Sequence, residues 1–169
     1  MTGLRNRRGV NIIINDELAR MKRMQLPIAV IALDVDHFKT YNDNYGHPAG
    51  DQVLQQLANV MLEMTSRAGE FAARMGGEEF VLFYPTVNRT AALELAEELR
   101  IKVLGLKIPH EKSLTAEYVT VSIGVISCVP EWELEFDTLL KAADDALYLS
   151  KTSGRNRVTC AELEANDQS

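Results

Sequence analysis

Apolar residues recur along the chain with two different spacings, which separate the predicted helices from the predicted strands. Three- and four-residue spacing predicts helices at Asn6–Met24, Pro48–Ser66 and Phe136–Ser153, and one that Asn88 or Thr90 can cap, running to Leu104. A short helix or turn is expected at Phe38–Tyr45, stopped by Gly46. Near-continuous or β-branched apolar runs predict strands at Ile28–Asp36, Phe71–Met75, Glu78–Tyr84, Tyr118–Cys128 and Arg157–Cys160.

Glycine and proline mark the breaks between these elements. Pro27 ends the first helix, and Gly154 stands at the position where glycine commonly closes a helix. Gly76 and Gly77 separate two apolar runs, which predicts a β-hairpin, because both turn positions can take a positive φ.

The order of elements, α-β-α-α-β-β-α-β-α-β, indicates an α+β fold. One helical region lies between the first core strand and the hairpin, and a helix and a strand follow, as in a ferredoxin-like βαββαβ core with additional helices. The hairpin places antiparallel strands in the central sheet and disfavours a doubly wound parallel sheet. We expect a single domain over residues 1–160 and a polar C-terminal tail over 161–169.

Composition is that of a soluble globular domain, with 46% apolar and 25% charged residues among 169. No apolar stretch is long enough for a membrane span, and the basic segment Met1–Arg8 is not expected to be a secretory signal, because no apolar region follows it. The net charge of −6 argues against a protein that coats nucleic acid, yet a small polyanion could bind where positive charge is local.

Cys128 and Cys160 are expected to be reduced thiols in the cytoplasm. The three histidines lack zinc-ligand spacing.

Four carboxylates stand at the ends of predicted strands. Asp34 and Asp36 end the first strand, and their spacing places both on one face, where they either meet solvent or hold a hard cation. Glu78 and Glu79 follow the glycine pair, where an acidic pair is usually solvated. In a ferredoxin-like core the two segments are neighbours, so Asp34 and Glu78 are expected to converge. One or two carboxylates with substrate phosphates are the usual ligands of Mg²⁺, and two such ions can assist phosphoryl transfer.

Three basic residues are candidate phosphate ligands. Lys39 follows Asp34 by five residues, and Lys151 and Arg155 lie near the end of the last helix, where basic residues also have an ordinary role in offsetting the helix dipole. Asn42 and Asp51 suit guanine, whose N–H groups a carboxylate can accept from, although Asp51 could equally be an acid near a helix start.

The order of these motifs resembles the GGDEF-domain diguanylate cyclases. The likeness spans almost the whole chain and depends on five segments: TGLRNRR at 2–8, DVDHFKTYNDNYGHPAGD at 34–51, RMGGEEF at 74–80, VTVSIGV at 119–125 and ADDALYLSKTSGRNRV at 143–158. The resemblance implies a nucleotidyl-cyclase-like fold and the condensation of two GTP molecules into cyclic di-GMP and two pyrophosphates. Each protomer of a homodimer would hold one GTP across a two-fold axis, with Mg²⁺, or Mn²⁺ in its place, as cofactor.

The same resemblance implies roles for individual residues. Asp34, Glu78 and the Val35 carbonyl would bind metal, and Glu78, aided by Glu79, would help to deprotonate the ribose 3′-hydroxyl for attack on the partner's α-phosphate. Lys39 would stabilise developing charge. The implied substrate contacts are Asn42, His47, Asp51, Gly76, Gly77, Lys151 and Arg155. Asp36 matches a motif carboxylate, and the resemblance leaves its direct role in metal binding open.

One position departs from the family pattern. Many members carry an Arg-x-x-Asp product-inhibition motif before the signature, and here the four residues are Arg67-Ala68-Gly69-Glu70. Arg67 is kept, but Glu70 is one methylene longer than aspartate, so we expect product binding there to be weak or absent. The resemblance also implies an upstream sensory or dimerisation domain, in a sensor that could be membrane-bound, with this domain itself touching neither membrane nor nucleic-acid polymer.

Two other functions remain open from the sequence. The domain could be a catalytically silent receptor or scaffold for GTP or cyclic di-GMP, although the signature shows none of the degenerate glycines or acids that would favour this. It could also be another nucleotidyl cyclase on a similar core.

Overall fold

A computed structural model describes residues 2–163 of the chain. Its eleven elements, in chain order, are β1 (Arg5–Asn6), α1 (Arg7–Met24), β2 (Ile28–Val35), α2 (Phe38–Tyr45), α3 (His47–Met64), β3 (Phe71–Gly76), β4 (Glu79–Pro85), α4 (Arg89–Gly105), β5 (Val121–Cys128), α5 (Phe136–Thr152) and β6 (Val158–Cys160). Most of the predicted tail, residues 164–169, lies outside the described residues.

A six-stranded sheet in the order β1-β3-β4-β2-β5-β6 forms the centre of the domain. Strand β2 is buried along its whole length and pairs antiparallel with β4 on one side and β5 on the other. The four strands β3-β4-β2-β5 are therefore the antiparallel core of a ferredoxin-like fold, which confirms the predicted α+β class. The short edge strands β1 and β6 add parallel pairs to β3 and β5.

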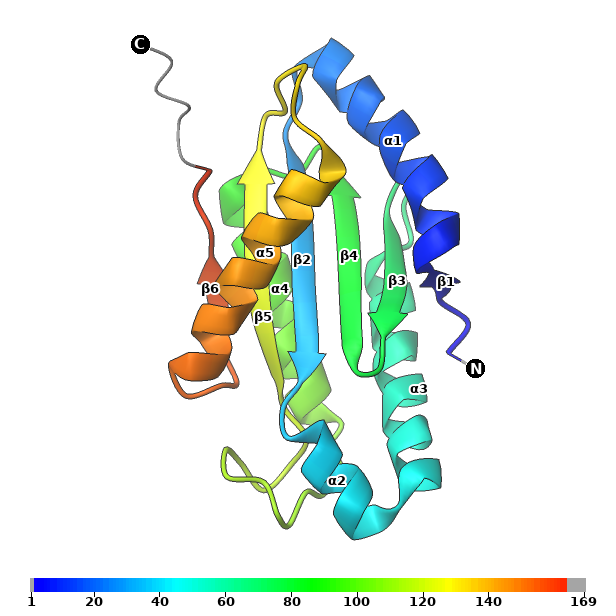
Figure 1. Cartoon of the computed structure of the whole chain (residues 1–169), viewed down its shortest axis with the longest axis vertical. Coiled ribbons are helices and arrows are strands. Elements are labelled where there is room, and N and C mark those ends of the chain that lie inside the picture. Colours follow the sequence, from blue (N-terminus) through cyan, green and yellow to red (C-terminus); the bar gives the residue numbers. More distant parts are fainter. Residues whose placement is uncertain (1, 164–169) are drawn as a thin grey trace.

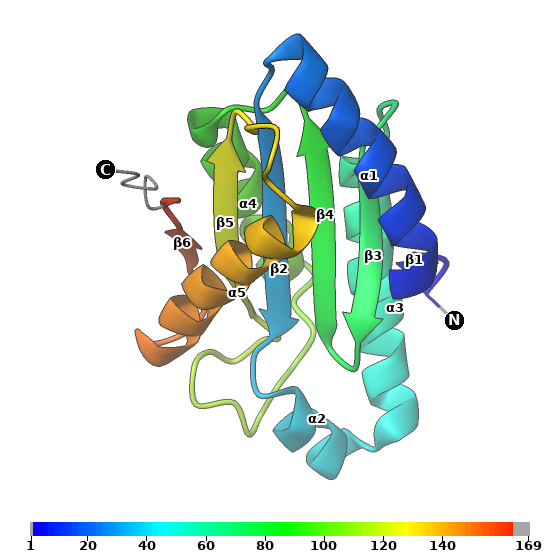
Figure 2. The same cartoon turned by 45° about the horizontal axis from the view of Figure 1, so that its top comes forward.

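Helices cover both faces of the sheet. Figure 1 shows α1 and α5 in front of the strands and α3 and α4 behind them, and each pair of helices buries its own apolar cluster against the sheet. In Figures 1 and 2 the end of β2, the β3–β4 turn, α2 and the C-terminal end of α5 all lie at one end of the molecule. Among the described residues, no helix has the length and apolar character needed to cross a bilayer.

The predicted elements are present with boundaries shifted by at most three residues. Asn88 caps α4 by accepting from the Ala91 N–H at 3.0 Å, one of the two predicted caps. The strand predicted from Tyr118 begins at Val121, because Tyr118 forms an isolated bridge with Pro109 instead. Strand β1 was not predicted, since two residues carry no periodicity.

The hairpin turn differs from its prediction. Gly76 is the last residue of β3, and the turn consists of Gly77 and Glu78, so only Gly77 needs a positive φ, of 52°. The register shifts between Arg74 and Gly76, which makes the strand bulge just before the turn. The Nε of Arg74 donates to the Gly77 carbonyl at 2.8 Å and holds the turn closed.

Helix α5 touches the backbone of β5 at Gly124. A Cβ at this position would lie 2.0 Å from the Ala143 carbonyl oxygen and 2.3 Å from the Leu147 nitrogen. One turn further along, the Ser150 hydroxyl donates to the Ile123 carbonyl at 2.7 Å. These backbone contacts fix how α5 lies on the sheet and therefore where its C-terminal end is placed.

We predict that Gly124→Ala lowers the free energy of unfolding by about 1–3 kcal/mol, because the new Cβ would clash with backbone atoms of α5 and the whole helix would have to shift. Denaturant unfolding followed by circular dichroism measures the change. Gly105→Ala is the matched control, because a Cβ there meets nothing within 4 Å. Equal stability of the Gly124→Ala variant and the wild type would contradict this account of the packing.

Candidate active site

Asp34 lies at the end of β2, on the face that α5 covers. Its side chain is 7% exposed, and its Oδ2 forms an ion pair of 2.9 Å with the Nζ of Lys151 from the last turn of α5. Two predicted site residues that are 117 positions apart in the sequence are thus brought together by the docking of α5 on the sheet.

The electrostatics of Asp34 are unusual for a surface carboxylate. Burial raises the pKa of its carboxyl group from 3.8 to about 6; the hydrogen bond and charge of Lys151 oppose this shift, and the charges of Glu78 and Glu79 add to it. A buried carboxylate beside other carboxylates is costly to ionise, and a bound cation would remove that cost. Titratable groups whose pKa is shifted by burial and by neighbouring charges are common at functional sites.

The two glutamates of the hairpin approach Asp34 in different ways. Glu79 is its direct cross-strand partner, so the two side chains emerge on the same face of the sheet. Glu78 lies in the turn, half-buried, and its charge, like that of Glu79, raises the pKa of Asp34. The sequence predicted that Asp34 and Glu78 converge, and both glutamates lie near enough to Asp34 for their charges to raise its pKa.

Asp36 shares this end of the sheet but is bonded within the protein. It is 2% exposed and accepts hydrogen bonds from the Thr120 hydroxyl at 2.7 Å, the Ser122 hydroxyl at 2.6 Å and the Asn156 N–H at 3.1 Å. Its own N–H donates to the Thr120 carbonyl at 2.9 Å. The structure therefore places Asp36 at the same end of the sheet as Asp34, with its acceptor oxygens bonded to Thr120, Ser122 and the turn after α5.

Arg155 lies in that turn. Its N–H donates to the Ser150 carbonyl at 2.9 Å, and its φ of 64° is in the left-handed region, as is the 45° of Asn156. Burial and the positive charge of Arg155 lower the pKa of the His37 imidazole, which places the Arg155 charge near the β2–α2 junction. Lys151 and Arg155 thus supply positive charge at the same end of the sheet as the carboxylates.

The residues predicted to recognise guanine lie on α2 and α3. Gly46, with a φ of 86°, forms the corner between these helices. Gly50 then allows them to pack closely, because a Cβ there would lie 1.8 Å from the Oδ1 of Asn42. That oxygen is buried and has no hydrogen-bond partner in the protein. Asp51, next to Gly50, is exposed on α3.

Four further predicted residues have open surroundings. Lys39 is exposed in the first turn of α2, and His47 is exposed at the first residue of α3. A Cβ at Gly76 or Gly77 would meet nothing within 4 Å, so the hairpin tip leaves room for close approach of a ligand to its backbone. All of these positions lie at the end of the sheet where β2 ends.

The donor set fits a hard divalent cation. Across residues 2–163, no three His, Cys, Asp or Glu side chains lie close enough together to hold a metal ion by themselves. Mg²⁺ does not require such a set, since one or two carboxylates with substrate phosphates and water are typical of it. Asp34 and Glu78 would supply carboxylate oxygens and Val35 a carbonyl, all of the oxygen type that Mg²⁺ prefers.

Arg67 and Glu70 lie at the other end of β3. The Glu70 carboxylate accepts from the backbone N–H of Arg67 at 3.0 Å, and the Glu70 N–H donates to the Arg67 carbonyl at 3.1 Å. Gly69, with a φ of 85°, completes this turn. The carboxylate is therefore engaged within its own turn, while the Arg67 side chain is exposed.

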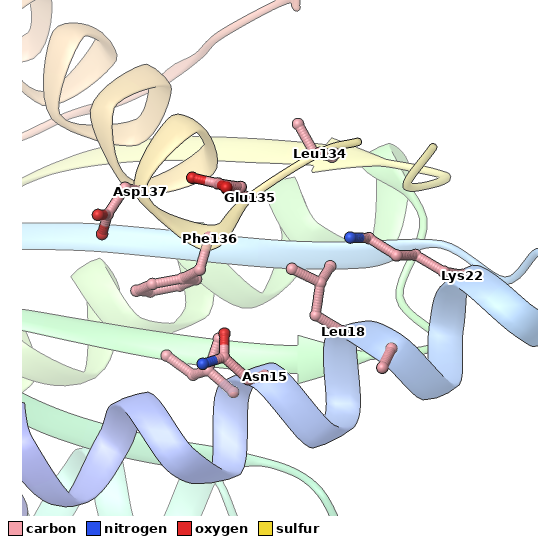
Figure 3. Close-up of a pocket in the computed structure, with 9 residues that line it drawn as sticks. Asn15, Leu18, Lys22, Leu134, Glu135, Phe136 and Asp137 are labelled. Atoms are coloured by element: carbon pink, nitrogen blue, oxygen red, sulfur yellow. The ribbon is translucent and has the colours of Figure 1, made fainter. Parts of the chain in front are cut away.

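A groove between α1 and the start of α5 is separate from this site (Figure 3). Asn15, Leu18 and Lys22 line one side, and Glu135 and Phe136 the other. None of the predicted site residues lines it. Because α5 rises about 1.5 Å per residue, its 17 residues place the groove roughly 25 Å from the Lys151 end.

Comparison with known proteins identifies the family. The family model for the GGDEF domain of diguanylate cyclases matches residues 1–157. The chain belongs to the GGDEF domain family. Curated relatives of this GGDEF domain include the diguanylate cyclases DosC and DgcM of Escherichia coli, 32% and 41% identical over 94% and 95% of the chain. The chain spans only about a third of their length, 34% and 37% respectively.

Solved GGDEF domains confirm the nucleotidyl-cyclase-like fold. The GGDEF domain of DgcB from Caulobacter crescentus, determined in complex with c-di-GMP, aligns with a TM-score of 0.85 and 34% identity, over 96% of this chain and 91% of that one. The active GGEEF domain of a diguanylate cyclase from Vibrio cholerae aligns with a TM-score of 0.81 and 32% identity, over 95% and 99%.

Several residues that shape the site were not predicted. Thr120 and Ser122 bond to Asp36, and Ser150 and Gly124 position α5. A glycine within a β-branched strand is a known indication of close backbone approach and could have identified Gly124. The hydroxyl residues gave no comparable indication, because their partners are distant in the sequence.

We predict that ionisation of Asp34 destabilises the metal-free protein. The folded-state pKa of about 6 lies above the ordinary 3.8, so the stabilisation from the bound proton is complete below pH 4 and is lost as the pH rises through 6. In chelator at pH 7.5, Asp34→Asn should then be more stable than the wild type by on the order of 2 kcal/mol, and the difference should shrink toward pH 4.

Thermal unfolding from pH 4 to 8 tests this prediction. Asp43→Asn, on the exposed side of α2, is the matched control and should follow the wild type. A difference between Asp34→Asn and the wild type that does not change with pH would contradict it.

Proposed function

We propose that this domain is a diguanylate cyclase that condenses two GTP molecules into cyclic di-GMP and two pyrophosphates. The observation that carries the proposal is the convergence at one end of the sheet of Asp34, the two glutamates of an intact signature, and the cations Lys151 and Arg155. Binding of a nucleoside triphosphate requires two kinds of group: carboxylates that can hold a divalent ion, and basic side chains that bind the phosphates. Both kinds are present here.

In this proposal Asn42 and Asp51 bind guanine. The buried Asn42 Oδ1, which lacks a partner, can accept a hydrogen bond from the base, and the Asp51 carboxylate can accept from the N1–H and N2–H groups. His47 contacts the substrate from the start of α3, and the open backbone at Gly76 and Gly77 allows the nucleotide to pass close to the hairpin.

Lys39, Lys151 and Arg155 bind the phosphates, and Lys39 stabilises the charge that develops on them. Lys151 already stands beside Asp34, so its ammonium group is near the acidic oxygens before substrate binds. Asp34, Glu78 and the Val35 carbonyl would hold Mg²⁺, or Mn²⁺ in its place; when bound, the ion supplies positive charge to the triphosphate and lowers the pKa of an oxygen bound to it.

The chemical step joins two protomers related by a two-fold axis. Glu78, assisted by Glu79, accepts the proton of the ribose 3′-hydroxyl as that oxygen bonds to the α-phosphorus of the partner's GTP and the bond to pyrophosphate breaks. The reciprocal step closes the ring and releases the second pyrophosphate. One domain holds one GTP, so turnover requires a homodimer.

The setting of the domain is also proposed. We place it in the cytoplasm, where GTP is available, as the output part of a longer sensor whose other regions control pairing. Two chains that pair weakly are converted to the productive dimer by mass action, so specific activity rises with protein concentration.

We predict that the domain converts GTP with Mg²⁺ into cyclic di-GMP and pyrophosphate, and that Glu78→Ala lowers kcat/KM by at least about a hundredfold, because a general base is lost. Chromatography of the products at several protein concentrations measures this. Glu94→Ala, an exposed glutamate on α4, is the matched control. GTP binding without turnover would support the silent receptor, and a mononucleotide product would support another cyclase.

We predict weak or absent high-affinity binding of cyclic di-GMP at Arg67, because the Glu70 carboxylate is held by the Arg67 N–H. Calorimetric titration should show no submicromolar site that depends on Arg67. Glu70→Asp, which restores the acid of the family motif, should bind the product more tightly. A submicromolar site in the wild type that disappears in Arg67→Ala would overturn this prediction.

A further inference from the structure

The carboxylate of Asp36 is nearly saturated with hydrogen bonds from the protein. Its Oδ2 accepts from both the Thr120 hydroxyl and the Asn156 N–H, and its Oδ1 accepts from the Ser122 hydroxyl. A carboxylate offers about four acceptor positions, so roughly one remains. With the side chain 2% exposed, little of it is available to a metal ion or a substrate.

The turn that Asp36 holds has an unfavourable backbone conformation. Gly154, Arg155 and Asn156 have successive φ values of 114°, 64° and 45°, and a residue with a side chain rarely adopts such values. A conformation of this kind persists only when its surroundings impose it. Here the Asn156 N–H is fixed by Asp36, and the Asn156 side chain accepts from the Nη1 of Arg100 at 2.8 Å.

The ends of the turn are fixed by other contacts. The Arg155 N–H donates to the Ser150 carbonyl, and the Arg157 carbonyl accepts from the Ile123 N–H at 2.9 Å. Asp36 is therefore the link between the middle of the turn and the strand that carries Asp34. Through it, the position of the Arg155 backbone is set relative to the end of β2.

We propose that Asp36 is a positioning residue, which holds the left-handed Arg155–Asn156 turn so that Arg155 is placed for phosphate binding, and that it is not a metal ligand. The part that concerns phosphate rests on the proposed function. The second acid of the Asp34-Val35-Asp36 motif then acts through Arg155, whereas the first acts directly.

Two substitutions separate positioning from metal binding. Asp36→Ala removes every acceptor, whereas Asp36→Asn keeps an oxygen that can accept from Thr120 and Asn156, and its amide can donate to the Ser122 oxygen. Positioning predicts that Asp36→Ala raises KM for GTP about tenfold with little change in kcat, and that Asp36→Asn recovers most of this loss.

A double-mutant cycle tests whether the effect passes through Arg155. In an Arg155→Ala background, Asp36→Ala should raise KM by less than about twofold, because the side chain that it positions is absent. The same tenfold increase in both backgrounds would overturn the proposal. The proposal would also be overturned if Asp36→Asn required a more than about tenfold higher Mg²⁺ concentration than the wild type for half-maximal activity. Such an increase is expected for the control variant Asp34→Asn.

Amide hydrogen exchange gives a readout that needs no activity. The Asn156 amide should be protected in the wild type and in Asp36→Asn, and should lose at least about tenfold of its protection in Asp36→Ala, relative to the Ala161 amide that donates to the Val125 carbonyl. An unprotected Asn156 amide in the wild type would overturn the proposal even if Asp36→Ala does not fold. If the wild type neither binds nor converts GTP, the proposed function fails, while this exchange still tests the anchoring of the turn.

Discussion

The close contact between α5 and Gly124 is the constraint on which the site depends. Backbone atoms of Ala143 and Leu147 occupy the space where a side chain would stand, so the helix can take this position only over glycine. From there, Lys151 reaches Asp34, and the chain turns back at residues 154–157 to pair with β5. The placement of Lys151 beside Asp34 thus depends on a strand position that is not itself one of the predicted site residues.

At the end of the sheet that carries the candidate site, buried polar contacts replace apolar packing. The middle of the domain is held by two apolar clusters, one on each face. Toward the end of β2, the buried groups become Asp34, Asp36, Thr120 and Ser122. Directed hydrogen bonds fix orientation more tightly than apolar contacts, which are non-directional. This change of interaction suits a region where oxygen atoms have to keep defined positions.

Much of the fold could be predicted from the sequence, because apolar spacing and glycine positions act locally. The hairpin, the ten longer elements and the Asn88 cap follow from neighbouring residues. The carboxylates and cations of the site were also predicted, partly by resemblance to the family. Contacts between distant parts of the chain could not be predicted, because nothing near Asp36 in the sequence indicates Thr120, Ser122 or Asn156 as its partners. The position of the hairpin turn at Gly77 and Glu78 was also missed, because it depends on a β-bulge that apolar periodicity does not reveal.

The ion pair between Lys151 and Asp34 bears on how the domain folds. In many small metal proteins the ligands repel one another until the ion arrives, so folding waits for the metal. Here the ammonium group of Lys151 lies 2.9 Å from the Asp34 carboxylate and offsets part of its charge. The domain therefore carries an internal counterion, which offsets part of the acidic charge before any divalent cation binds.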